Sequence, residues 1–185
     1  MIRPALKEDI EQVMPLLHDA IGSIACSLAG VEDEAEAMNI LKEFYVQENN
    51  RISYRNMIVF ESDGVAAGML LCYGGDKVES LDAPFIDRIK KETGREHTIT
   101  PETRPGEFYL DSIAVDGRYQ GQGIAKKLMA AFEAKALQEG YSLVSLIVEQ
   151  YNDRAHALYS KQGYSEDGEL TLSGHLYMRM VKPVG

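Results

Sequence analysis

The chain has 185 residues, which suits one domain with a substantial core and leaves little room for two. Its 29 acidic residues outnumber 19 basic ones, and the net charge of −10 argues against a nucleic-acid partner and favours an amine-bearing or basic one. Without a long apolar run or a leader-like N-terminus, we expect a cytoplasmic protein with no membrane partner.

The first part of the chain reads as a short strand, two amphipathic helices and a β-hairpin. Pro15 lies inside the first helical pattern, and we expect it to kink or shorten that helix. Residues 21–28 are apolar and fit either a helix or a strand. The predicted elements are a strand at 1–4, helices at 8–20 and 33–47, and hairpin strands at 56–61 and 65–73.

Residues 75–105 differ in composition from the segments on either side. They begin with glycines, continue with a helical pattern at 84–91, and end in an aperiodic stretch at 98–105 with two prolines. We expect a single domain over 1–185 with an insert here, formed by a helix and an irregular loop. Connections of this length are often functional, so a lid over an acceptor site is our hypothesis.

A strand, a glycine turn and a helix start follow at residues 107–127. Alternating side chains predict a largely buried strand from Glu107 to Val115, which Asp116-Gly117 ends. Gly121 and Gly123 come directly before a helical pattern that starts at Ile124. A helix N-terminus preceded by glycines presents unpaired N–H groups, so this turn is a candidate seat for phosphate oxygens.

The C-terminal part predicts a second buried strand, a short helix and a final hairpin. Residues 143–148 form an apolar run that fits a strand parallel to the central one, joined to it by a right-handed βαβ unit. Asn152 is a favourable N-cap for the short helix that carries Tyr159. The hairpin strands are expected at 164–170 and 175–181. The overall pattern predicts the α/β (α+β) class.

Three phosphate-bearing ligands are candidates for the glycine turn: a nucleoside triphosphate, a dinucleotide and coenzyme A. A nucleoside triphosphate does not fit, because the Lys-Ser/Thr pair of the Walker loop is missing. A dinucleotide fits poorly, since Lys126 stands where the third glycine is needed and Glu149 follows Gly121 too late for the ribose contact. Coenzyme A, whose pyrophosphate needs the same seat, remains.

Two sequence blocks resemble the GNAT superfamily of N-acetyltransferases. The run from Arg118 to Gly123, RYQGQG, matches the superfamily's Arg/Gln-x-x-Gly-x-Gly/Ala pattern, and the block from Asn152 to Tyr164 is similar to its second signature. The resemblance implies a mixed, mostly antiparallel sheet of six or seven strands with helices on both faces. It also implies a splayed parallel strand pair and acetyl-CoA as cosubstrate. No metal is expected, because the histidines and the two cysteines lack the spacing of metal ligands.

The same resemblance implies which residues contact the coenzyme. The pantetheine arm would lie along the central strand as an added strand does, which requires the sheet to open, and a bulge near Asp111 or Ser112 is expected there. The implied contacts are Ile113, Ala114, Val115, Arg118, Gln120, Gly121, Gln122, Gly123, Ile124, Ala125, Lys126, Asn152 and Tyr159.

The implied reaction is direct attack of a neutral primary amine on the acetyl thioester in a ternary complex. Glu107, with Asp111 in reserve, is the candidate base, and Tyr159 takes the family's position for the proton donor to the thiolate. Glu107, Tyr109, Asp111 and Ile113 are expected on one side of the strand. Either carboxylate also fits a salt-bridged or solvated role.

Two functional classes stay open at this stage. The chain fits an enzyme that acetylates a small-molecule or peptide amine, and it also fits a regulatory module that binds acetyl-CoA without turnover; a dinucleotide-binding protein is the weaker alternative. A homodimer is implied by resemblance only.

Overall fold

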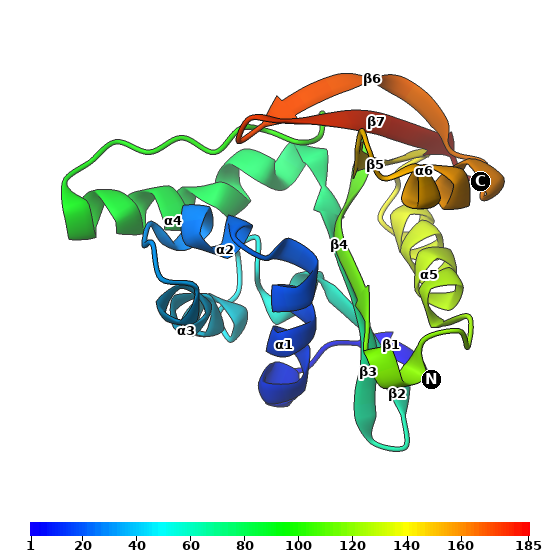
Figure 1. The fold of residues 1–185 in the computed structure, drawn as a ribbon, viewed down its shortest axis with the longest axis horizontal. Coiled ribbons are helices and arrows are strands. Elements are labelled where there is room, and N and C mark those ends of the chain that lie inside the picture. The colour runs from blue at the N-terminus through cyan, green and yellow to red at the C-terminus, as the bar shows by residue number, and fades with distance from the viewer.

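The computed structural model describes residues 1–185 as one seven-stranded sheet between two layers of helices (Figure 1). The strand order is β1-β2-β3-β4-β5-β7-β6, and every neighbouring pair is antiparallel except β4 and β5. The predicted mixed, mostly antiparallel sheet is confirmed. The strands are β1 (Ile2–Pro4), β2 (Met57–Ser62), β3 (Val65–Gly74), β4 (Phe108–Val115), β5 (Leu143–Glu149), β6 (Ser165–Leu172) and β7 (His175–Pro183).

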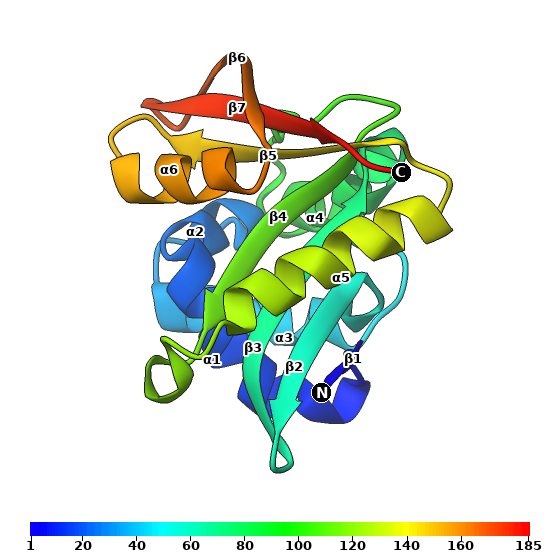
Figure 2. The ribbon, with the colours of Figure 1, turned by 90° about the vertical axis from the view of Figure 1, so that its right-hand side faces the viewer.

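Helices cover both faces of this sheet. The helices are α1 (Ile10–Ile21), α2 (Ile24–Ala29), α3 (Glu34–Tyr45), α4 (Val78–Thr93), α5 (Ile124–Gln138) and α6 (Asp153–Lys161). The first four lie on one side, while α5 runs across β2, β3 and β4 on the other side, with α6 beside β5 (Figure 2). None of these helices combines the length and the apolar character that crossing a membrane requires.

Each face of the sheet buries its own apolar core, because successive side chains of a strand point to opposite faces. On β4, Phe108 packs toward α5 and stacks on Phe132 at 5.5 Å between ring centroids. Its neighbour Tyr109 faces the other layer and packs with Tyr73 at 5.8 Å. These buried aromatic side chains pack β4 against both helical layers.

The structure corrects two expectations for this half, a helix shortened at Pro15 and a short helix in the insert, and it resolves the ambiguity at residues 21–28; a kink at Pro15 stays a prediction. Helix α1 continues through Pro15, because this residue lies on the exposed face where water can reach the carbonyl that lost its donor. The ambiguous residues 21–28 are mostly helical, with Gly22 at φ +52° separating α1 from α2. The helix of the insert is twice as long as expected and spans Val78–Thr93.

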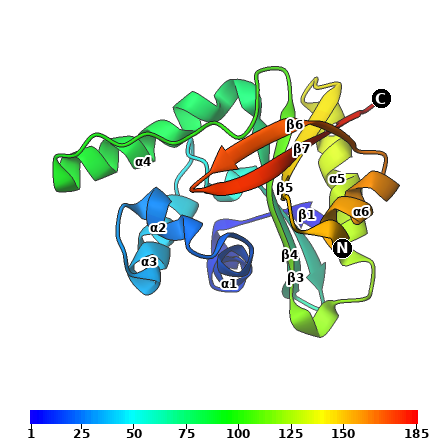
Figure 3. The same cartoon turned by 45° about the horizontal axis from the view of Figure 1, so that its top comes forward.

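The irregular segment 94–107 follows α4 back to the sheet and ends beside β7 (Figure 3). Its last residues are fixed in place. Gly106 donates its N–H to Asp76 at 3.0 Å, and Thr103 donates its hydroxyl to Glu107 at 3.1 Å. The segment therefore lies between β3 and β4 as predicted, and the part near β4 is held by hydrogen bonds.

Candidate active site

The parallel strands β4 and β5 separate after two residue pairs. Phe108 lies opposite Val144 and Tyr109 opposite Ser145, and no pairing continues beyond them. The register between β3 and β4 changes here, since Leu71 pairs with Ser112 and Cys72 with Leu110, which leaves Asp111 as the extra residue of a bulge. The predicted bulge and the splayed strand pair are confirmed. Residues 110–115 of β4 thus offer backbone groups without a partner strand on the β5 side.

The bulge also overturns one expectation about side-chain direction. Tyr109 faces the layer of α1–α4, and Asp111 bonds to Arg51 and Tyr73 on that same side. Ile113 packs against the opposite core, beside α5. The four residues expected on one side therefore do not share it, because one inserted residue reverses the alternation beyond the bulge.

The glycine turn ends where predicted, and α5 begins at Ile124. Gly121 and Gly123 have φ of +77° and +74°, a conformation that other residues adopt only with strain. No side chain caps the helix, no acidic residue occupies its first turn, and a Cβ at either glycine would meet nothing within 4 Å. The first N–H groups of α5 are thus open to an anion, which is the fit that a pyrophosphate requires.

Two polar side chains of the turn already have partners. Arg118 bonds to Asp116, with Nη2 at 2.7 Å from Oδ2, and Gln120 donates to the carbonyl of Val115 at 3.4 Å. These contacts close the end of β4 onto the turn. A phosphate contact by Arg118 stays a prediction, since its guanidinium would have to leave the carboxylate of Asp116 to bind the phosphate.

Helix α6 presents Tyr159 on the α5 side of the sheet. Asn152 caps the helix as predicted, accepting the N–H of Ala155 at 3.1 Å. The ring of Tyr159 lies edge-on to Tyr164 at 5.9 Å between centroids, and its hydroxyl makes no hydrogen bond within the chain. Burial raises the pKa of Tyr159, so the phenol keeps its proton at neutral pH. A protonated hydroxyl without a partner can donate to a leaving group.

Both carboxylates expected as bases are in ion pairs. Glu107 is buried and accepts from Arg179 at 2.6 and 3.2 Å. Burial acts to raise its pKa, but hydrogen bonds from Arg179, Ser145 and Thr103 hold the pKa of Glu107 below its usual value. Asp111 accepts from Arg51 at 2.8 Å and from its neighbour Ser112. This geometry favours the salt-bridged role for each, and a base role for Glu107 or Asp111 stays a prediction.

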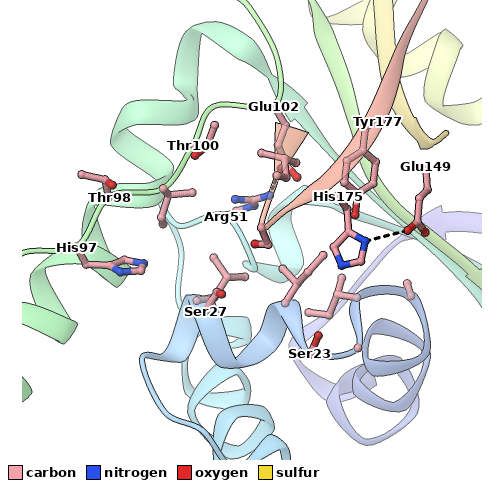
Figure 4. A pocket seen from close by; sticks show the side chains of 18 of the residues that line it. Ser23, Ser27, Arg51, His97, Thr98, Thr100, Glu102, Glu149, His175 and Tyr177 are labelled. Atoms are coloured by element: carbon pink, nitrogen blue, oxygen red, sulfur yellow. Dashed lines mark hydrogen bonds and ion pairs between the residues drawn. The ribbon is translucent and has the colours of Figure 1, made fainter. Parts of the chain in front are cut away.

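A cleft of about 800 Å³ opens on the face of α1–α4 (Figure 4). Its walls are the end of α1, helix α2, the irregular segment and the turn between β6 and β7. Glu149, the last residue of β5, reaches the cleft and pairs with His175 at 3.3 Å. The cleft therefore extends to the end of the strand that splays from β4. The side chains labelled in the figure are Ser23, Ser27, Arg51, His97, Thr98, Thr100, Glu102, Glu149, His175 and Tyr177.

A buried arginine with three carboxylates lies on the floor of this cleft. Arg51, 6% exposed, contacts Asp111 at 2.8 Å, Asp82 at 3.6 Å and Glu102. Burial, with added repulsion from Asp111 and Asp82, raises the pKa of Glu102 to about 7, although Arg51 opposes the shift. With one cation for three acids, the cluster has an excess of negative charge when all are ionised.

Sequence reasoning did not identify Arg51 or Glu102. Both lie in aperiodic segments, and 51 residues separate them in the chain. The one signal was the length of the segment before β4, which predicted a functional connection without indicating its chemistry.

Comparisons with known proteins show the family and the fold. A sequence profile described as the Acetyltransferase (GNAT) family matches residues 28–164. A solved acetyltransferase structure is 32% identical, with all of both chains covered and a TM-score of 0.83. An N-acetyltransferase from Staphylococcus aureus Mu50, 21% identical over 98% of this chain and 99% of its own, has a TM-score of 0.76 and shows the same fold.

One curated relative has a named substrate. The spermine/spermidine N(1)-acetyltransferase of Bacillus subtilis (strain 168) is 32% identical over 79 residues. That match covers 42% of this chain and spans only about half (51%) of the relative. The profile match over most of the chain, together with the full-length structural match, shows that this protein belongs to the GNAT family of N-acetyltransferases.

Proposed function

We propose that this protein transfers the acetyl group of acetyl-CoA to a primary amine on a cationic acceptor. The observation that supports this most is the separation of β4 from β5, which leaves residues 110–115 of β4 without a partner strand. The open N-terminus of α5 lies at one end of this gap, and the acidic cleft reaches the end of β5. A coenzyme arm along β4 would bring the thioester between the two.

The coenzyme would be held mainly by backbone groups. The N–H groups at the start of α5 would bind the pyrophosphate, and Ile113, Ala114 and Val115 would bond to the pantetheine amides as a strand does. Lys126, exposed in the first turn of α5, adds a positive charge beside the phosphates. Asn152, whose Oδ1 caps α6, keeps its amide N–H groups for the arm.

The chemistry needs two proton transfers. The amine nitrogen forms a bond to the carbonyl carbon, the carbon–sulfur bond breaks with its electron pair on sulfur, and the nitrogen loses one proton. Tyr159 would donate its phenolic proton to the departing thiolate and recover one from solvent. A backbone N–H of Ile113 or Ala114 would stabilise the negative charge that develops on the carbonyl oxygen. Direct attack requires both substrates to be bound at once.

The charge of the cleft supports a cationic acceptor. Asp19, Glu102 and Glu149 line it, while its one permanent cation, Arg51, is already surrounded by carboxylates. A polyamine suits this lining, because the reacting amine must be neutral while its other ammonium groups need negative partners. The Bacillus subtilis relative named for spermine and spermidine supports the same acceptor class.

Release of free thiol from acetyl-CoA tests the proposal. We expect release with spermidine at rates that fall as salt screens the cleft, and much slower release with a neutral-tailed amine such as butylamine. Double-reciprocal plots at several acceptor concentrations should intersect, as a ternary complex requires. Binding of acetyl-CoA without thiol release for any amine would instead identify a regulatory module, and no binding at millimolar acetyl-CoA would refute the coenzyme assignment.

A further inference from the structure

We propose that Glu102 is the catalytic base, and that the irregular segment before β4 serves to bring this carboxylate to the acceptor amine. The inference rests on the proposed acetyl transfer and names the group that accepts its first proton. The residue belongs neither to the central strand nor to either block that resembles the family.

The first argument is position. Glu102 lines the cleft, and its Oε2 bonds to Nη2 of Arg51. The Nε of the same guanidinium bonds to Asp111, the bulged residue at which β4 leaves β5. One guanidinium group therefore places the carboxylate of Glu102 beside the opening of the strand pair, where the thioester would lie.

The second argument is an available oxygen. Oε1 of Glu102 makes no hydrogen bond within the chain, and the side chain is 14% exposed, so it can accept a proton from a bound amine. Asp111 differs, since both oxygens accept hydrogen bonds, one from Ser112 and the other from Arg51 and Tyr73. Glu107 likewise uses both oxygens.

The third argument is proton affinity. A general base works best when its pKa lies near the working pH, and burial brings the pKa of Glu102 to about 7. At neutral pH it can therefore both take a proton and release it again to solvent through the cleft. The charged groups that act on this pKa are Arg51, which lowers it, and Asp111 on β4 and Asp82 on α4, which raise it. The other titratable groups that face Glu102 are Tyr73 on β3, Tyr109 on β4 and Tyr177 on β7, and the negative charge of Glu102 helps to raise the pKa of each.

In the proposed step, the acceptor nitrogen forms its bond to the acetyl carbon while its N–H proton moves to Oε1 of Glu102. The electron pair of the broken carbon–sulfur bond stays on sulfur, which takes the proton of Tyr159. The hydrogen bond from Arg51 keeps the carboxylate oriented, so Arg51 is a positioning residue.

The test is the full-length Glu102→Gln variant, assayed with acetyl-CoA and spermidine across pH. We expect kcat to fall by about 100-fold or more, while calorimetry gives an acetyl-CoA Kd within about twofold of wild type. In wild type, kcat/KM should rise with pH through a limb near pH 7, because the base must be ionised, and the variant should lack this limb. Glu96→Gln is the matched control, because Glu96 lies on the same segment in an exposed pair with Lys90, and it should change neither value.

Three outcomes would overturn the inference. They are wild-type turnover in Glu102→Gln, a limb near pH 7 that persists in its residual activity, and an equal loss in the Glu96→Gln control. The glutamine variant should fold, because burial disfavours the ionised form that it replaces; if circular dichroism shows otherwise, Glu102→Asp serves, with an expected shift of the limb. Failure of the proposed function looks different, since wild type itself would then release no thiol with any amine.

Discussion

The pair between Glu107 and Arg179 gives the sharpest test of whether Glu107 serves the fold or the chemistry. Glu107 is 4% exposed, and it bonds to Arg179 through both carboxylate oxygens, 72 residues away in the chain. The one other carboxylate on this guanidinium is Asp167, at 3.0 Å and partly exposed. Glu107→Ala would therefore leave a buried guanidinium with a single, solvent-facing partner.

Removing one member of a buried ion pair costs about 3–5 kcal/mol. For a chain of this size, each kcal/mol lowers Tm by roughly 2–4 °C, so we expect a drop of roughly 6–20 °C for Glu107→Ala. Glu107→Gln keeps one acceptor oxygen and should lose less. The pH dependence has a definite sign. Because the pair lowers the pKa of Glu107, its stabilisation is fully present above the unfolded value near pH 4.3 and is lost progressively as pH falls from there through the lower pKa of the folded state.

Urea unfolding at pH 7 and at pH 3.5 measures this directly. The difference between wild type and Glu107→Ala should be large at pH 7 and measurably smaller at pH 3.5. The control is Glu11→Gln, which breaks an exposed pair with Lys42 and should cost no more than about 1 kcal/mol. A Glu107→Ala protein as stable as wild type, with its turnover abolished, would refute the structural role and restore Glu107 as a candidate base.

Three further predictions concern the glycines and Tyr159. Gly75→Ala should destabilise the protein by about 1–3 kcal/mol in urea unfolding, because its Cβ would lie 2.0 Å from the carbonyl oxygen of Arg104. Gly123→Ala should cost about 1–2 kcal/mol, because alanine is strained at φ +74°, and should weaken acetyl-CoA binding in calorimetry. Tyr159→Phe should reduce kcat at least tenfold with acetyl-CoA affinity nearly unchanged, because it removes the proton donor and keeps the ring.

Each of these has a contradicting result. Gly117→Ala is the control for both glycines, since its φ is not positive and nothing lies within 4 Å of its Cβ; a loss as large as at Gly75 would show that the clash is not the cause. Unchanged acetyl-CoA affinity in Gly123→Ala would argue against the pyrophosphate seat. Lost affinity with normal turnover in Tyr159→Phe would reassign Tyr159 to binding.

Features that depend only on residues close together in the sequence were predictable. The start of α5 after Gly123 and the cap of α6 at Asn152 follow from local backbone chemistry, and both are observed. The bulge near Asp111 followed from the family resemblance. Its effect on side-chain direction was missed, because the alternation rule was applied through the bulge to Ile113.

The cleft between α2, the irregular segment and β7 was beyond sequence reasoning for a physical reason. Its floor joins Arg51, from a turn before β2, to Glu102, from a segment with no periodic pattern, and only tertiary packing brings them together. The proton affinity of Glu102 likewise depends on burial, which no local pattern encodes. Glu107 forms its ion pair with Arg179, which lies on β7 and far away in the sequence. The sequence of β4 alone therefore could not show whether Glu107 is a general base or a carboxylate that stabilises the fold.

The two residue pairs that join β4 to β5 form a narrow seam between two halves of the sheet. On one side β1–β4 form a continuous ladder, and on the other β5, β7 and β6 form a second one. A coenzyme arm lying in the gap would add hydrogen bonds and packing contacts between the two halves. Amide hydrogen exchange along residues 110–115 should therefore slow when acetyl-CoA binds. The two halves of the sheet should also move less relative to one another in the bound protein. Bound acetyl-CoA would then also stabilise the fold, by linking the two halves of the sheet.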